Sequence, residues 1–151
     1  MSIENIILDR DRRGVSILRA CLPEDYCHQA ASFVLANPGV AIIVTGFYIL
    51  GARATETDGP PGAVVLGKAL QSIGYDVVYV TDRYTYSLLK AIAGPRSQTI
   101  KFPITDDKRS KTFAVGILSK ISPTILISIE RCGPNDEGRY LNMRGQDITN
   151  Y

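Results

Sequence analysis

The sequence predicts an α/β fold, in which a mainly parallel sheet of about four strands is covered by helices on both faces. Two observations carry this prediction. Short runs rich in β-branched residues alternate with segments whose apolar residues recur every three or four positions. Strand and helix also follow each other in strict succession, which implies right-handed crossovers and therefore parallel strands.

The strands are predicted from four apolar runs. They are Val40–Val44, Val77–Val80, Thr99–Ile104 and Thr124–Ile129. The first has the composition of a strand that is buried on both faces, and Asn37-Pro38-Gly39 ends the helical pattern before it. A strand order 3-2-1-4 would place the first and fourth strands beside the point where the order reverses. In such sheets the ligand binds there, outside the carboxyl ends of the strands.

Helices are predicted before and between these strands. Apolar residues recur at helical spacing from Val15 to Leu35, and Pro23 divides this stretch into two helices. Three further helices follow the first three strands, at Pro60–Ile73, Tyr84–Ala93 and Asp106–Ile121. Gly74 and Gly94 come directly after the first two of these, at the position where a glycine commonly ends a helix.

Length and composition predict a single α/β domain, residues 1–151. The chain has 151 residues, of which 45% are hydrophobic and 21% charged, and a chain of this size buries enough surface to fold without a disulfide or a metal. We expect N-terminal helices in 1–38, alternating strands and helices in 40–130, and a loop and tail that carry motifs in 131–151. The longest apolar stretch, Val40–Val44, is too short to span a membrane, so no membrane partner is expected.

Charge and cysteine content argue against several classes of function. The net charge is only +2, and no basic cluster exceeds Arg10, Arg12 and Arg13, so nucleic acid is not an expected partner. Three cysteines without a Cys-x-x-Cys motif, together with one histidine, predict neither a disulfide framework nor a zinc site. These features indicate an intracellular compartment, either the cytoplasm or, in a eukaryote, the mitochondrial matrix. The first 13 residues lack the apolar segment of a signal peptide, so the mature protein is expected to start here.

The loop between the first strand and the next helix is a candidate anion cradle. Thr45 and Gly46 follow the strand, and the loop closes with Glu56-Thr57-Asp58-Gly59-Pro60-Pro61-Gly62-Ala63. Proline at a helix start wastes no N–H donor, Gly59 and Gly62 let a ligand approach the backbone, and the helix N-terminus attracts an anion. The loop is therefore suited to a carboxylate or a phosphate.

A second interpretation of the same loop is purely structural. Thr57 or Asp58 would then be a helix cap, and Glu56 would be a solvated loop residue. The spacing favours neither interpretation over the other. The loop lacks the Gly-x-Gly-x-x-Gly pattern of dinucleotide sites and the Gly-Lys-Ser/Thr of a P-loop, so a nucleotide site is the weaker hypothesis.

Polar residues also follow the second and fourth strands. Glu130 and Arg131 end the fourth strand, where an acid or base and a carboxylate-binding guanidinium would be useful, or where they could form an ion pair within the loop. Asp82 follows the second strand, a position more typical of a helix cap than of a ligand contact. Asn142 and Arg144 lie further on, in a run of turn-forming residues.

Taken together, these motifs resemble those of the D-glutamate cyclase family. The segments that carry the resemblance are Thr45-Gly46-Phe47, Glu56 to Ala63, Val80-Thr81-Asp82, Ser128-Ile129-Glu130-Arg131 and Tyr140 to Ile148. The resemblance implies a Rossmann-like three-layer sandwich. It also implies a hydro-lyase that interconverts D-glutamate and 5-oxo-D-proline with loss or gain of water. Family members are longer, and their second half carries a Gly-Asp-Gly-Gly-Asn-Glu-type segment that has no counterpart here, so the chain resembles the N-terminal half of the usual length.

The implied reaction assigns roles to the polar residues. Ring closure needs a free amine, a proton for the departing oxygen, and donors for the oxyanion. Glu56 and Glu130 are the candidates for base and acid, with Asp58 as the alternative. The candidate substrate-binding residues are Thr45, Gly46, Thr57, Gly59, Gly62, Asp82, Arg131, Asn142 and Arg144. The acidic residues could instead bind a divalent cation, which takes oxygen ligands, and no other cofactor is expected.

Another class of function stays open beside the enzyme. The chain could be a non-catalytic module that binds a small anion or an amino acid, as one half of a larger cyclase. A sheet that ends soon after its fourth strand has open edges and an uncovered apolar face. We therefore expect a homo-oligomer, or a partner that supplies the missing half.

Overall fold

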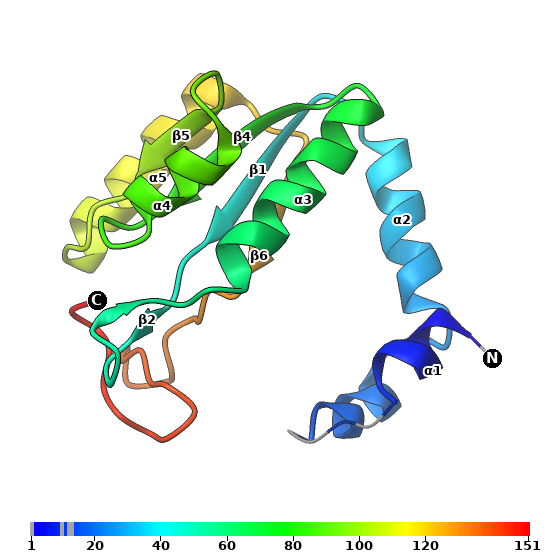
Figure 1. The fold of residues 1–151 in the computed structure, drawn as a ribbon, viewed down its shortest axis with the longest axis horizontal. Coiled ribbons are helices and arrows are strands. Elements are labelled where there is room, and N and C mark those ends of the chain that lie inside the picture. Colours follow the sequence, from blue (N-terminus) through cyan, green and yellow to red (C-terminus); the bar gives the residue numbers. More distant parts are fainter. Residues whose placement is uncertain (1, 10, 12–13) are drawn as a thin grey trace. The chain divides into compact units, whose positions relative to one another are not determined.

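The structure, a computed structural model, describes residues 2–9, 11 and 14–151. The basic cluster of Arg10, Arg12 and Arg13 lies outside the described residues. The chain divides into two compact units, Met1–Pro38 and Gly39–Tyr151 (Figure 1). The single α/β domain of residues 1–151 therefore stays a prediction. Among the described residues, none of the helices combines the length and the apolar character that crossing a bilayer requires.

The first unit consists of short helices. They are α1 (Ile3–Ile7), the 3₁₀ helix η1 (Val15–Cys21) and α2 (Tyr26–Ala36). The two helices predicted around Pro23 are therefore present, but the first of them is a 3₁₀ helix. No side chain caps the start of this 3₁₀ helix. The guanidinium of Arg19 donates to the carbonyl oxygens of Pro23 and Glu24, which fixes the chain that follows the helix. The buried Glu4 carboxylate accepts the N–H of Cys27 at 3.1 Å and so links α1 to α2.

The second unit contains the predicted parallel sheet. Its strands are β1 (Val40–Thr45), β4 (Asp76–Thr81), β5 (Gln98–Lys101) and β6 (Ile125–Ile129). They lie in the order β5-β4-β1-β6, and every neighbouring pair is parallel. This is the order 3-2-1-4, with the first and fourth strands side by side. The α/β fold class and the predicted strand order are therefore confirmed.

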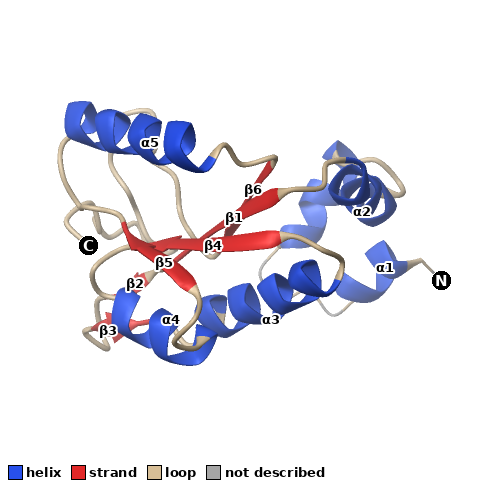
Figure 2. Ribbon diagram, turned by 90° about the horizontal axis from the view of Figure 1, so that it is seen from above, coloured by secondary structure: helices blue, strands red, loops and turns tan. Residues whose placement is uncertain are grey.

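Helices cover both faces of this sheet and make three layers. Helices α3 (Gly59–Ser72) and α4 (Tyr86–Ala93) lie on one face, and α5 (Asp107–Ile121) lies on the other (Figure 2). Under α5 the core consists of Ile42, Val78 and Val80, against which Ile117 and Ile121 pack. Val78 and Val80 face the same side of the sheet because side chains two residues apart in a strand point to the same face.

The sheet leaves one edge strand partly uncovered. Leu126, on the edge strand β6, is 57% exposed, whereas its neighbour in register, Ile42 on β1, is 2% exposed. An apolar edge strand without a charge or a proline is a surface on which another chain can pair. The predicted association with another copy or partner stays a prediction.

Three details differ from the sequence prediction. A hairpin of β2 (Tyr48–Ile49) and β3 (Ala54–Thr55) occupies the stretch between β1 and α3. The sequence did not predict it, because strands of two residues carry no detectable period. The strand β5 ends at Lys101 rather than Ile104, since Pro103 has no N–H for the ladder. Helix α4 starts at Tyr86 rather than Tyr84, since the two residues before it form its capping turn.

Candidate functional site

An ion pair lies at the carboxyl edge of the sheet. Nη1 of Arg131 donates to Oδ2 of Asp82 at 2.6 Å and to the carbonyl oxygen of Gly46 at 3.0 Å. The side chain of Asp82 is 3% exposed and that of Arg131 is 28% exposed. Residues that follow β1, β4 and β6 are thus joined at one point, as parallel strands with a common carboxyl edge require.

Asp82 has a structural role at this point. Its Oδ1 accepts the N–H groups of Tyr84 and Thr85 at 2.8 and 3.0 Å, and its Oδ2 accepts from Arg131. Both carboxylate oxygens are therefore engaged within the protein, and the interpretation of Asp82 as a cap holds. Gly46, at φ +131°, leaves room for this arrangement, because a Cβ there would lie 2.8 Å from Oδ2 of Asp82. Asp82 thus positions Arg131, and its predicted contact with a ligand stays a prediction.

Part of the Arg131 guanidinium is free to bind a ligand. No described residue accepts a hydrogen bond from its Nε or Nη2, whereas Nη1 is held on two oxygens. A guanidinium that is fixed at one nitrogen and free at the others can bind a carboxylate with two parallel hydrogen bonds. The ion pair of Arg131 is formed with Asp82 and not, as the sequence suggested, with Glu130 of the same loop. The alternative prediction, a carboxylate site at Arg131, is compatible with this geometry.

Buried threonines connect the hairpin to this edge. The hydroxyls of Thr55 and Thr85 lie 2.6 Å apart, and the hydroxyl of Thr81 donates to the carbonyl oxygen of Thr45 at 2.6 Å. The N–H of Glu56 donates to the carbonyl oxygen of Phe47 at 2.9 Å. These bonds hold the segment that carries Glu56 against the start of α4 and the end of β1. Thr45 is fully buried and therefore a structural element of the edge.

Glu56 and Glu130 meet over Gly59. A Cβ on Gly59 would lie 2.7 Å from Cβ of Glu130 and 2.8 Å from Oε1 of Glu56, so only glycine leaves both side chains in place. Glu130 itself is held at φ +48°, a conformation that non-glycine residues adopt at a cost. The two acids at the ends of different segments are therefore brought together by the fold.

The environment of Glu56 favours its protonated form. Its Oε1 is buried and has no hydrogen-bond partner among the described residues. Burial, followed by the charges of Glu130 and Asp58, raises the pKa of Glu56 from 4.5 to about 7. A carboxyl that titrates near neutral pH can both donate and accept a proton, which is what general acid–base chemistry requires.

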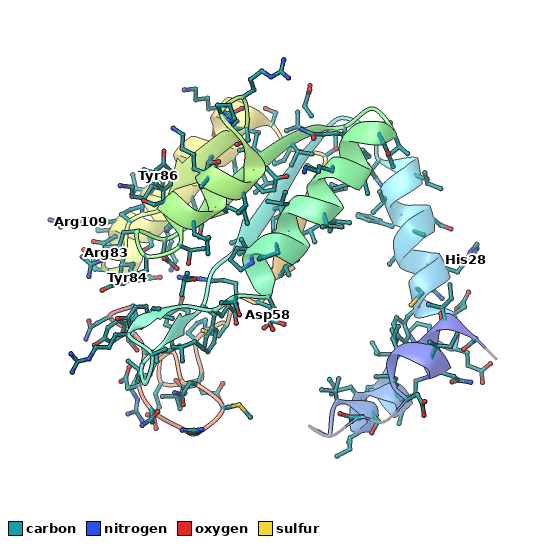
Figure 3. The ribbon with its side chains drawn as sticks, in the orientation of Figure 1. His28, Asp58, Arg83, Tyr84, Tyr86 and Arg109 are labelled. Atoms are coloured by element: carbon teal, nitrogen blue, oxygen red, sulfur yellow. The ribbon has the colours of Figure 1, made fainter. Side chains whose placement is uncertain are left out.

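The start of α3 differs from the predicted anion cradle. Asp58 caps the helix by accepting the N–H of Gly59 at 3.2 Å, and the N–H of Gly62 donates to the carbonyl oxygen of Asp58. Pro60 and Pro61 have no N–H, so the first turn has no backbone donor left for an anion. Figure 3 shows Asp58 at this end of α3, close to the hairpin. Thr57 is exposed beside it. The capping interpretation of Asp58 is therefore confirmed.

The second motif forms a turn away from these groups. Oδ1 of Asn142 accepts the N–H groups of Arg144 and Gln146 at 2.9 and 3.0 Å, and Leu141 forms an isolated antiparallel bridge with Asp147. Asn142 therefore builds a local turn. Arg144 is exposed, and no described residue contacts its guanidinium, so the structure does not bring it together with Arg131.

A cavity of about 290 Å³ opens beside Arg131. The residues after β1, β5 and β6 line it, together with the first turns of α5 and the C-terminal turn. Lys111 and Ser110 come from α5, and Cys132 follows Arg131. Burial, only partly offset by the charge of Arg131, raises the pKa of the Cys132 thiol, and the charge of Glu56 raises it further. Glu56 is thus electrostatically coupled to a residue that lines the cavity.

Comparison with known proteins shows which family the chain belongs to. A family model described as D-glutamate cyclase-like, C-terminal, matches residues 3–151. The match is therefore to the C-terminal part of the family, and the prediction that the chain corresponds to the N-terminal half was wrong. The chain belongs to the D-glutamate cyclase-like family. The human protein named D-glutamate cyclase, mitochondrial, is 31% identical over 131 residues, which are 78% of this chain and 21% of that protein. The chain therefore spans about a fifth of the length of this curated relative.

Some residues at the carboxyl edge of the sheet were not predicted from the sequence. Lys111, Ser110 and Tyr48 line the cavity, yet the sequence analysis singled out none of them. For Lys111 a signal existed, because it lies in the first turns of the helix after the third strand and so near the same sheet edge. The described residues contain no group of three or more His, Cys, Asp or Glu side chains placed to hold a metal ion, so the hypothesis of a divalent cation gains no support from their geometry.

The raised pKa of Glu56 makes stability depend on pH. Because the native pKa is about 7 and the unfolded value is 4.5, the native protein holds a proton that the unfolded chain has lost between these values. Raising the pH through this window therefore destabilises the fold. Glu56→Gln, which stays neutral, should match the wild type below pH 4.5 and exceed its free energy of unfolding by roughly 1–2 kcal/mol at pH 8.

Urea unfolding of the two proteins between pH 4 and pH 8.5 measures this difference. Glu137→Gln is the matched control, because Glu137 is exposed and pairs only with the neighbouring Arg139. Identical pH dependence of the wild type and Glu56→Gln would show that Glu56 titrates normally.

Proposed function

We propose that this chain has D-glutamate cyclase-like activity and interconverts D-glutamate and 5-oxo-D-proline plus water. The observation that carries the proposal is the pair of Glu56 and Glu130 over Gly59, with the pKa of Glu56 raised to about 7. Membership of the family supports the choice of reaction. Two carboxyls with different environments can share the roles of acid and base at neutral pH.

In the proposed ring closure, one carboxyl accepts a proton and the other donates one. The amine of D-glutamate attacks the carbon of the γ-carboxyl, so that a C–N bond forms and a C–O bond breaks. Glu130, the more exposed carboxylate, takes a proton from the attacking nitrogen. Glu56 in its protonated form gives its proton to the departing hydroxyl, whose own proton came from the substrate's ammonium, so that water leaves. The proton on Glu130 then passes to Glu56 and restores both groups, so the two protons that the nitrogen loses equal the two that the departing oxygen gains. The reverse reaction uses the same groups in the opposite roles.

Arg131 is the proposed carboxylate-binding residue. It directly follows Glu130, and Asp82 holds one of its nitrogens at 2.6 Å. Its remaining donors face no competing acceptor among the described residues, so they can bind and polarise the reacting carboxyl. Asp82 contributes through Arg131, by fixing the direction of the guanidinium.

Turnover by the purified chain tests the proposal directly. We expect D-glutamate to yield 5-oxo-D-proline, and 5-oxo-D-proline to yield D-glutamate, both followed by chiral chromatography. Both reactions should approach the same ratio of the two compounds, because a catalyst does not change an equilibrium. Heat-unfolded protein is the control. A folded wild-type chain without turnover in either direction would contradict the proposal.

A second candidate function has its own support. The chain spans only about a fifth of the human relative, and a non-catalytic module that binds a small anion or an amino acid would need Arg131 but not the acid pair. Binding of D-glutamate in calorimetry without any turnover would favour this alternative. Either function fits the proposed intracellular location, in the cytoplasm or the mitochondrial matrix. The human relative is named as a mitochondrial protein, and the three free cysteines also support this location.

A further inference from the structure

We propose that the cavity beside Arg131 is the subsite for the α-carboxylate of the substrate and that Lys111 is the residue that selects for it. This inference rests on the proposed function, because it assigns the two ends of a glutamate-sized ligand to two parts of one site. Nothing in the family comparison assigns a role to Lys111 or to the cavity.

The position of the cavity supports the assignment. It lies where the strand order reverses, between the residues that follow β1, β5 and β6, and Arg131 is part of its wall. Its volume of about 290 Å³ is at the small end of the range for ligand pockets and suits a molecule the size of an amino acid. Arg131 and Cys132, both in the wall, directly follow Glu130 in the chain, so the cavity adjoins the proposed acid–base pair.

The polar groups of the wall fit a carboxylate. Lys111 contributes an ammonium group, and Thr105 and Ser110 contribute hydroxyls from the start of α5. The only partner of Lys111 among the described residues is Asp107, at 2.8 Å, in a pair whose side chains are 75% and 80% exposed. An exposed pair of this kind contributes little, so the ammonium can turn to a ligand at small cost.

The reaction itself explains why such a subsite is needed. Ring closure consumes the amine and the γ-carboxyl, whereas the α-carboxylate stays ionised in both D-glutamate and 5-oxo-D-proline. The acid pair of Glu56 and Glu130 disfavours an anion nearby, and Asp82 already neutralises part of the charge of Arg131. Lys111, a second cation in the same wall, therefore gives the α-carboxylate a partner besides Arg131.

The test compares D-glutamate with 4-aminobutyrate, which is the same molecule without the α-carboxylate. Calorimetry on the full chain is expected to show that D-glutamate binds about tenfold more tightly than 4-aminobutyrate. In Lys111→Gln the affinity for D-glutamate should fall about tenfold, while the affinity for 4-aminobutyrate is unchanged. Lys111→Arg, which keeps the charge, should restore most of the preference.

Arg109→Gln provides the matched control. Arg109, labelled in Figure 3, is on the same helix, is similarly exposed and pairs with Asp106. It lines a different groove from Lys111. This variant should bind both compounds as the wild type does. Circular dichroism and urea unfolding confirm that all variants are folded.

The outcomes separate this inference from the proposed function. If Lys111→Gln keeps the full preference for D-glutamate, or if the wild type binds neither compound, the inference is wrong. If the wild type shows the preference and Lys111→Gln loses it, the inference stands even when turnover is absent, and only the catalytic proposal fails. If turnover persists unchanged in Lys111→Gln with an unchanged KM, the catalytic proposal survives and the subsite does not.

Discussion

Replacing Glu56 by glutamine is expected to lower kcat for ring closure of D-glutamate at pH 7 by about 10²- to 10⁴-fold. Glutamine has nearly the shape of a protonated glutamic acid, but it cannot give a proton to the departing oxygen. The buried Oε1 of Glu56 has no hydrogen-bond partner among the described residues, so the substitution breaks no bond of the native protein. The loss therefore reports on proton transfer and not on folding.

The pH dependence of the wild-type rate sharpens this prediction. Because Glu56 has a pKa of about 7 and acts as the acid in ring closure, kcat should fall as the pH rises above 7. The residual activity of Glu56→Gln should not show this fall. Glu130→Gln removes the proposed base and should lose activity as well, while Glu137→Gln, in an exposed loop, should not. Folded Glu56→Gln and Glu130→Gln proteins that both keep full activity would contradict the proposed mechanism.

Replacing Gly67 by alanine is expected to destabilise the fold by about 3 kcal/mol. Gly67 lies in α3 directly over Tyr79 of β4, and an added Cβ would lie 2.0 Å from the hydroxyl oxygen and 2.8 Å from Cζ of that tyrosine. Tyr79 is 2% exposed and is part of a central strand, so its ring has little room to move. The helix must shift away from the sheet, which also disturbs the α3 segment that starts beside Glu56.

Two variants serve as controls in urea unfolding. Gly116→Ala is also in the interior of a helix, but its Cβ would meet no atom within 4 Å, so it should gain about 0.5–1 kcal/mol from helix propensity. Tyr79→Phe in the Gly67→Ala background removes the oxygen at 2.0 Å and should recover part of the loss. Equal stability of Gly67→Ala and the wild type would show that α3 does not pack on Tyr79 as closely as described.

Local patterns were sufficient for most of the fold. Runs such as Val40–Thr45 carry β-branched residues and sit between helical patterns, so their number, type and parallel arrangement follow from sequence periodicity. The hairpin of Tyr48–Ile49 and Ala54–Thr55 was not predictable in this way, because each strand is shorter than one full period of alternation. Its position depends on bonds to other segments, such as the contact between the Thr55 and Thr85 hydroxyls.

The same limit applies to the candidate site. Sequence patterns alone place Asp82, Glu130 and Arg131 at one edge, because parallel strands bring all their carboxyl ends together. The tertiary structure alone decided that Asp82 holds Arg131, that Glu56 meets Glu130 over Gly59, and that Lys111 shares a cavity with Arg131. Periodicity is a property of neighbouring residues, whereas these contacts join side chains from different segments, and their distances depend on how strands and helices pack in three dimensions.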